Sequence, residues 1–195
     1  MPILRIDQFP DGSGAVSNDD LILFLDNPSG SSTTKYMKIS DMAGATYKHY
    51  GSFYDTTIQT NVNVSGINTI KINSTNISSG ISIASGTRLL FANSGIYNIQ
   101  FSAQIEKTDG GDDTIEIWLS KNGSGVADSN TSITLHQQDA KTVAAWNFLV
   151  SANSNDYYEL KWYSTDPGLI ILAQSGLTNP NRPEIPSIIL TAVQV

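Results

Sequence analysis

The sequence contains no cysteine, which excludes disulfide frameworks, thiol catalysis and cysteine-based zinc sites. This absence also suits a chain made in a reducing cytoplasm. Basic residues are few: 11 Lys and Arg against 18 Asp and Glu give a net charge of −7, which disfavours binding to a nucleic-acid backbone. Charged residues of both signs make up only 15% of the chain, where about 25% is usual for soluble proteins.

Long apolar runs are missing as well. The longest, LILFL and LIILA, are far shorter than the roughly 20 residues that a membrane helix needs. The first ten residues, MPILRIDQFP, have no basic region followed by an apolar stretch, so we expect no signal peptide. We therefore expect no membrane partner.

Small polar residues take the place of charge, since 57 of the 195 residues are Ser, Thr or Asn. These side chains compete with the helical backbone for hydrogen bonds, so they favour strands and turns. The clearest strand runs from Tyr97 to Glu106, where apolar and polar residues alternate, and it predicts a half-buried antiparallel strand. Asn122-Gly123 predicts a tight hairpin turn, and Gly110-Gly111 with the adjacent Asp residues predicts another.

Residues 51–195 contain about nine or ten such segments separated by turn residues, without helical patterns, which indicates a β-sandwich or jelly roll. The segment KTVAAWNFLVS is apolar at both odd and even positions. A strand with two apolar faces is either central in its sheet or covered by an interface.

Residues 1–50 differ from the remainder because they are rich in turn signals and too short to fold well alone. We expect a strand at LILFLD and a returning strand at KYMKIS. The region is interpreted as an anchoring arm, and five residues are expected to contact the anchor: Leu21, Leu23, Phe24, Tyr36 and Ile39.

No catalytic pattern occurs in the sequence. The two histidines, His49 and His136, stand outside any metal-binding spacing, and neither a nucleophile elbow nor a phosphate-binding loop is present. The cluster Asp109, Asp112 and Asp113 is expected to be a solvated turn, and calcium binding there stays open. We expect no enzymatic activity, no cofactor and no bound metal.

Other polar and aromatic residues have two interpretations each. Glu106 and Glu116 flank the predicted Gly110-Gly111 hairpin, where paired carboxylates would suit glycoside hydrolysis, but a solvated outer-face position is favoured. Three aromatic residues have two interpretations: Trp118, Tyr157 and Tyr163. If exposed, they would stack on sugars or line a subunit interface, but some of them are expected to be core residues.

Two stretches resemble known proteins. FANSGIYNIQF, from Phe91 to Phe101, resembles the core signature of the complement-subunit/TNF-like jelly roll, a Phe followed by Gly-x-Tyr and alternating aromatic residues, and departs from it at Ile99. IWLSKNG, TVAAWNFLV and NDYYELKWYS follow the strand order of that family and resemble most its version in virion proteins of tailed bacteriophages. The segment DQFPDGSGAVSNDDLILFLDNPSGSSTTKYMKISDM resembles N-terminal segments of phage fibre and virion-surface proteins.

The resemblance, which covers residues 51–195, implies a homotrimer in which one sheet of each subunit packs around a three-fold axis. That sheet is expected to contain the strands at Tyr97–Glu106, Tyr157–Tyr163 and Ile188–Val195. Residues on its other face are then expected to point toward the axis or its rim: Gln100, Ser102, Tyr157 and Tyr163.

The sequence thus predicts an all-β protein, an antiparallel jelly-roll β-sandwich over residues 51–195 with an N-terminal arm over residues 1–50. The function expected from the resemblance is a non-enzymatic, homotrimeric capsid decoration protein of the cement or head-fibre type, assembled in the host cytoplasm and displayed on the virion surface. Its arm would bind the major capsid protein or another virion protein. The alternative is a tail-fibre or receptor-binding protein whose loops 108–113, 122–132 and 176–186 contact host surface glycans. A third hypothesis is a small carbohydrate-active enzyme that uses the carboxylates above.

Overall fold

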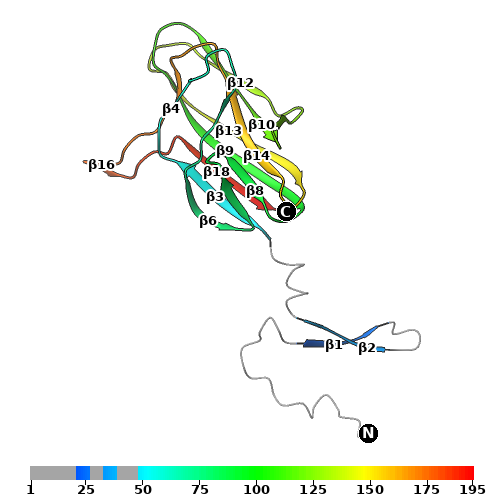
Figure 1. The fold of residues 1–195 in the computed structure, drawn as a ribbon. Coiled ribbons are helices and arrows are strands. Elements are labelled where there is room, and N and C mark those ends of the chain that lie inside the picture. Colours follow the sequence, from blue (N-terminus) through cyan, green and yellow to red (C-terminus); the bar gives the residue numbers. More distant parts are fainter. Residues whose placement is uncertain (1–20, 27–32, 39–47) are drawn as a thin grey trace. The chain divides into compact units, whose positions relative to one another are not determined.

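The computed structural model describes residues 21–26, 33–38 and 48–195. It divides the chain into two compact units, residues 1–47 and 48–195, whereas the sequence analysis put the boundary after residue 50. The regular structure of the described ranges consists of β-strands throughout (Figure 1). These ranges contain no helix with the length and hydropathy needed to cross a bilayer.

The N-terminal unit contains an antiparallel hairpin of β1 (Leu21–Asp26) and β2 (Thr33–Lys38), paired from Leu21 opposite Lys38 to Asp26 opposite Thr33. The predicted strand LILFLD is confirmed, and the returning strand begins two residues before KYMKIS. Leu21 and Tyr36 are exposed; Ile39 and the side chains of Leu23 and Phe24 lie outside the described residues. A two-stranded hairpin by itself is at best marginally stable in water.

The second unit is described throughout and contains strands from β3 to β18. In chain order they are β3 Tyr50–Asp55, β4 Gln59–Thr60, β5 Asn68–Thr69, β6 Ser74–Ser79, β7 Ile81–Ala84, β8 Arg88–Phe91, β9 Gly95–Lys107, β10 Asp113–Lys121, β11 Ser124–Gly125, β12 Thr131–Leu135, β13 Lys141–Ala152, β14 Tyr157–Tyr163, β15 Leu169–Ile171, β16 Leu177–Thr178, β17 Asn181–Arg182 and β18 Ile188–Gln194.

These strands form two antiparallel sheets and one small separate hairpin, β16–β17. One sheet, here called the β9 sheet, has the order β4-β15-β9-β18-β3-β6. In this sheet β18 and β15 pair with successive parts of one edge of β9, and β13 pairs with the opposite edge. The other, the β14 sheet, has the order β11-β10-β14-β8-β7, with β12 also pairing with β10 and β5 with β14.

The eight principal strands of residues 48–195 pair in a nested pattern. In chain order the first pairs with the eighth (β3 with β18), the second with the seventh (β8 with β14), the third with the sixth (β9 with β13) and the fourth with the fifth (β10 with β12). This nesting folds one long double ribbon into two facing sheets, which is the jelly-roll architecture. The predicted fold class is therefore confirmed.

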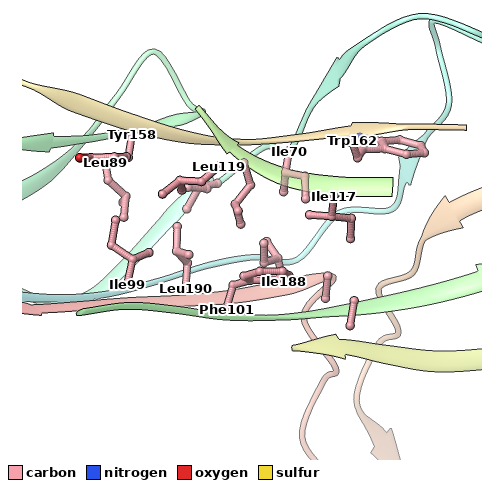
Figure 2. Packing of buried hydrophobic residues seen from close by; sticks show 14 of the residues in the cluster. Ile70, Leu89, Ile99, Phe101, Ile117, Leu119, Tyr158, Trp162, Ile188 and Leu190 are labelled. Atoms are coloured by element: carbon pink, nitrogen blue, oxygen red, sulfur yellow. The ribbon is translucent and has the colours of Figure 1, made fainter. Parts of the chain in front are cut away.

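The hydrophobic core lies between the two sheets, as Figure 2 shows. Ile99, Phe101 and Leu190 project from the β9 sheet toward Leu119 and Trp162 of the β14 sheet. Their rows follow from the period of two along each strand, which places alternate side chains on one face. The predicted inward row of β9, Tyr97 to Ile105, is confirmed because each of its members is buried.

The Phe91–Tyr97 signature has a structural explanation. Both side chains are fully buried, and their rings meet edge to face with centroids 4.5 Å apart. The Tyr97 hydroxyl donates a hydrogen bond of 2.9 Å to the carbonyl oxygen of Asn93, which closes the turn between β8 and β9. The signature thus fixes where the chain passes from the β14 sheet to the β9 sheet.

Of three predictions about turns and strand positions, one is confirmed and two are wrong. The turn at Asn122-Gly123 is confirmed, since both residues have positive φ and Lys121 pairs with Ser124 across it. The prediction of a hairpin at Gly110-Gly111 is wrong. β9 and β10 belong to opposite sheets, so residues 108–112 cross between the sheets. The central position for β13 is also wrong, because within the described chain β13 pairs with β9 alone and forms an edge.

Asp156 links two turns at one end of the sandwich. Its carboxylate accepts hydrogen bonds from the Asn122 side chain (2.7 Å) and the Asn153 backbone N–H (2.8 Å), and forms an ion pair with Lys121 Nζ (2.8 Å). The Lys121 hydrogen bond is the largest cause that lowers the pKa of Asp156 from 3.8 to about 2. Asp156 therefore connects the β10–β11 turn to the β13–β14 turn through its charged form.

We predict that Tyr97→Ala lowers the free energy of unfolding by about 3–5 kcal/mol, because it empties a large buried site between the sheets. Tyr97→Phe keeps the ring and loses only the hydrogen bond to Asn93, so it should cost about 0.5–1.5 kcal/mol. Urea denaturation of both variants measures the two costs, and equal costs would contradict this account of the signature.

We also predict that the stabilisation from Asp156 depends on pH. Because the pKa is lower in the folded state, this stabilisation is complete above the ordinary pKa of 3.8 and is lost as the pH falls toward about 2. The difference in unfolding free energy between wild type and Asp156→Asn should be largest above pH ~5 and should shrink steadily below it. A difference that is constant across this pH series would show that the charge of Asp156 does not stabilise the fold.

Candidate interaction surface

The outer face of the β9 sheet carries a continuous surface without charged side chains. From Ile96 to Gln104, the outward positions of β9 and the positions that pair with them on β13, β18 and β3 contain no Asp, Glu, Lys or Arg. We call this surface the neutral face; its members are Ile96, Asn98, Gln100, Ser102 and Gln104 on β9, Val143, Ala145, Asn147, Leu149 and Ser151 on β13, Ile189, Thr191 and Val193 on β18, and Tyr50, Ser52 and Tyr54 on β3.

Large apolar side chains on the neutral face are open to solvent. Leu149 is 69% exposed and Val193 is 44% exposed, and the register places both opposite Asn98 on the two sides of β9. Ile189, Val143 and Ile96 are also exposed. Depletion of charge together with exposed apolar side chains is the composition of the centre of a protein interface.

The neutral face is hollowed in two places that meet at Ile189. One hollow of about 260 Å³ is lined by Gln100, Phe101, Ser102, Ile189 and Thr191. The other, of about 270 Å³, lies over β3, and its lining also includes Glu184 and Pro186 from outside the neutral face. Side chains of a facing protein would fit such shallow hollows.

The four residues expected to face the three-fold axis do not share one sheet. Gln100 and Ser102 lie on β9, at the centre of the neutral face. Tyr157 and Tyr163 lie on β14, in the opposite sheet, so the expectation that their strand joins β9 and β18 is wrong. The ring of Tyr157 is covered by the Arg88 guanidinium, whose carbon lies 4.3 Å from the ring centroid.

The sequence pattern gave little indication of the apolar members of the neutral face. Its one signal was the two-faced apolar pattern of KTVAAWNFLVS, which the structure resolves into an inner row and an exposed row containing Val143 and Leu149. An edge strand with an exposed apolar row fits the second explanation offered for that pattern, a strand covered by an interface. The same signal was present in Ile189 and Val193, which alternate with the buried residues of β18.

The acidic cluster differs from the one expected. Carboxylate oxygens of Asp109, Asp113 and Asp166 lie within 4.8 Å of one another, whereas Asp112 lies outside this group and contacts His136 Nδ1 at 3.1 Å. The fully buried Lys107 stands among the carboxylates.

Lys107 Nζ donates hydrogen bonds to Asp109 (2.7 Å) and to the carbonyl oxygen of Gly110 (2.8 Å), and it forms an ion pair with Asp113. Burial disfavours the charged form of Lys107, but these carboxylates outweigh it and raise the pKa of Lys107 above its ordinary value. The hydrogen bond from Lys107 also lowers the pKa of Asp109. The ammonium group thus places one positive charge where a calcium ion would bring two.

The paired-carboxylate hypothesis does not survive the topology. Glu106 lies on β9 and forms an ion pair with Lys141, while Glu116 lies on β10 in the other sheet and accepts a hydrogen bond of 2.8 Å from Asn130. Two carboxylates on the outer faces of opposite sheets cannot flank one glycosidic bond.

We predict that calcium does not stabilise the wild-type protein, because the Lys107 ammonium group already pairs with Asp109 and Asp113. The unfolding temperature should be the same in EDTA and in about 1 mM Ca²⁺. Lys107→Met should lower the unfolding temperature in EDTA, and Ca²⁺ should restore part of it. The control Lys141→Met, which changes an exposed ion pair, should show no response to calcium, and a rise of several degrees in the wild type would contradict the prediction.

Comparison with solved structures finds distant likenesses. A crystal structure of murine APRIL at pH 8.0 is 14% identical with a TM-score of 0.48, and another at pH 8.5 is 10% identical with a TM-score of 0.47; each covers 76% of this chain and 100% of that chain. The globular domain of zebrafish complement 1qA protein is 11% identical with a TM-score of 0.44, over 76% of this chain and 96% of that chain. No family model and no curated protein matches the sequence. The jelly-roll assignment therefore rests on the strand pairing of the chain itself.

Proposed function

We propose that this protein is a non-enzymatic structural protein of the virion surface of a tailed bacteriophage, a homotrimeric capsid decoration protein whose residues 1–50 anchor it to the capsid. The observation that supports the trimer is the neutral face, and the virion role is proposed from the sequence resemblance described above. Three copies that meet through it would bury Leu149, Val193 and Ile189, which the single chain leaves exposed. Burial of apolar surface is the main favourable term in such association.

The trimer assignment comes from the resemblance of residues 51–195 to complement-subunit/TNF-like jelly rolls, and the neutral face supports it. In this arrangement the β9 sheets face the three-fold axis and the β14 sheets face outward. Gln100 and Ser102 keep their proposed positions toward the axis, whereas Tyr157 and Tyr163 are placed on the outside. An interface that closes on itself in this way needs a well-packed area of obligate size.

The anchoring role is supported by the β1–β2 hairpin. Leu21 and Tyr36 are exposed there, and a two-stranded hairpin gains stability when it packs on another surface. Three arms held together by one trimeric domain would bind a capsid with a high effective concentration, so weak contacts at each arm add up to firm attachment.

The tail-fibre or receptor-binding alternative uses the same trimer. The position of the protein on the virion distinguishes this alternative from capsid decoration. Immunogold labelling of virions of the encoding phage should show many copies spread over the head for a decoration protein. Labelling confined to the tail would replace the decoration hypothesis by the alternative.

We predict a solution mass near three times 21.0 kDa for the full chain, measured by light scattering after size exclusion. Leu149→Asp and Val193→Asp place charges on the neutral face, where each would have to be buried in the interface. Both variants should therefore run as monomers.

The matched control is Leu177→Asp, which makes the same change at an exposed leucine of the β16–β17 hairpin and should leave the trimer intact. Thermal unfolding of each variant shows whether the jelly roll itself still folds. A monomeric wild type would refute the intrinsic trimer, and a folded Leu149→Asp variant that remains trimeric would refute the neutral face as its interface.

A further inference from the structure

A second surface feature lies on the opposite side of the sandwich. A groove of about 470 Å³ runs over the outer face of β10 and β14, and we call it the Trp118 groove; it is lined by Glu116, Trp118, Val126, Asp128, Asn130 and Tyr163. Glu116 and Tyr163 are direct cross-strand partners, and Trp118 pairs with Lys161 at the next outward position. Trp118 and Tyr163 are therefore diagonal neighbours on one face.

The segment that forms one wall of the groove is held firmly on β10 by Ser129. The Ser129 side chain is almost fully buried; its hydroxyl accepts a hydrogen bond from the Leu119 N–H (3.1 Å) and donates one to the Val126 carbonyl oxygen (2.7 Å). The Val126 N–H in turn donates to the Leu119 carbonyl oxygen at 2.8 Å. Asp128 and Asn130 are the neighbours of this fixed residue, so the backbone that carries their side chains into the groove is held in place.

The polar groups of the groove both donate and accept hydrogen bonds. Glu116 and Asp128 offer carboxylate acceptors, Asn130 offers an amide, and Trp118 and Tyr163 offer an indole N–H and a phenol hydroxyl. The amide of Asn130 donates to Glu116 Oε2 at 2.8 Å, which leaves its carbonyl oxygen and a second N–H for a ligand. Such a mixture matches hydroxyl groups, which donate and accept, better than an ammonium group, which only donates.

Charge around the groove excludes anionic ligands. The lining contains two acidic residues and no Lys or Arg. The nearest lysine in the strand register, Lys161, is held by Glu159 (2.8 Å) and by the Thr69 hydroxyl (2.7 Å). A phosphate or an acidic sugar would therefore meet repulsion without a compensating cation.

The aromatic residues supply flat apolar surface beside these polar groups. Trp118 and Tyr163 are both half-buried, so each presents part of its ring to solvent. Another aromatic residue of the same sheet, Tyr157 at the other end of β14, is instead covered by Arg88 and is not among the residues that line the groove. Aromatic surface next to paired donors and acceptors fits a ring that has apolar C–H faces and a hydroxylated edge, which is the chemistry of a neutral pyranose.

We propose that the Trp118 groove binds a neutral pyranoside, with the sugar ring packed on Trp118 and Tyr163 and its hydroxyl groups bonded to Glu116, Asp128 and Asn130. The inference goes beyond the decoration role and does not depend on it. The groove is on the β14 sheet and the neutral face is on the β9 sheet, so trimer assembly leaves three grooves open. The three sites of one trimer would bind a repeating polysaccharide with avidity.

The test is saturation-transfer NMR with the full chain and a panel of neutral oligosaccharides of glucose, galactose, mannose and N-acetylglucosamine. At least one member should receive saturation at its ring protons, and Trp118→Ala should weaken its binding tenfold or more. Trp118→Phe, which keeps an aromatic ring, should retain part of the affinity. Asp128→Asn, which keeps the shape of the side chain, should weaken binding less than Trp118→Ala.

The matched control is Tyr157→Ala on the same strand as Tyr163, which should bind the sugar as the wild type does. Light scattering and thermal unfolding of every variant separate loss of the groove from loss of the trimer or of the fold. The proposal is overturned if no neutral sugar binds, if binding survives unchanged in a folded Trp118→Ala variant, or if tetramethylammonium or an acidic sugar binds in the groove in place of the neutral panel. A polymer that binds more tightly than its free monosaccharide would identify a polysaccharide as the source of the sugar.

Discussion

β9 imposes the constraint on which the remainder of the jelly roll depends. It pairs with β13 along one edge and with β18 and then β15 along the other, so most of its residues are fixed in register from two sides. A slip of one residue would turn its inner row, including Tyr97 and Phe101, out of the core and bury Asn98 and Gln100 in its place. The register of β9 therefore determines both the burial of the core and the composition of the neutral face, because the same alternation produces both.

Local chemistry predicted much of this arrangement, and pairing at long range did not follow from it. The alternation in β9, the turn at Asn122-Gly123 and the strand LILFLD are each set by residues close together in the chain. The alternation in β14 says which side chains point inward but not which sheet contains the strand, so Tyr157 and Tyr163 were assigned to the wrong sheet. Gly110-Gly111 likewise permits a sharp change of direction without saying whether the next strand pairs with the last or crosses to the facing sheet.

The candidate surfaces were harder to predict than the fold, for a physical reason. An interface residue such as Leu149 has the same side chain as a core residue, and only its position on an edge strand shows that the single chain leaves it exposed. The Trp118 groove gathers residues from β10, β14 and the segment around Ser129, and no short motif records that these three pieces meet. The acidic cluster illustrates the same point, because Asp109 and Asp113 are joined there by Asp166, which is far away in the chain.

The strand order also determines how the domain would transmit a mechanical load. Tyr50 at the start of β3 is paired with Val193 near the end of β18, and the Gln194 N–H bonds to the His49 carbonyl oxygen, so residues 48 and 195 lie at the same end of the sandwich. A force between these two points would open the β3–β18 pair one hydrogen bond at a time. A force between residue 48 and the loop at 108–112, at the other end of β9, would instead load the paired strands along their length, so that many bonds resist together. A domain tethered through its arm is thus weak if pulled by its last strand and strong if pulled by its far loops.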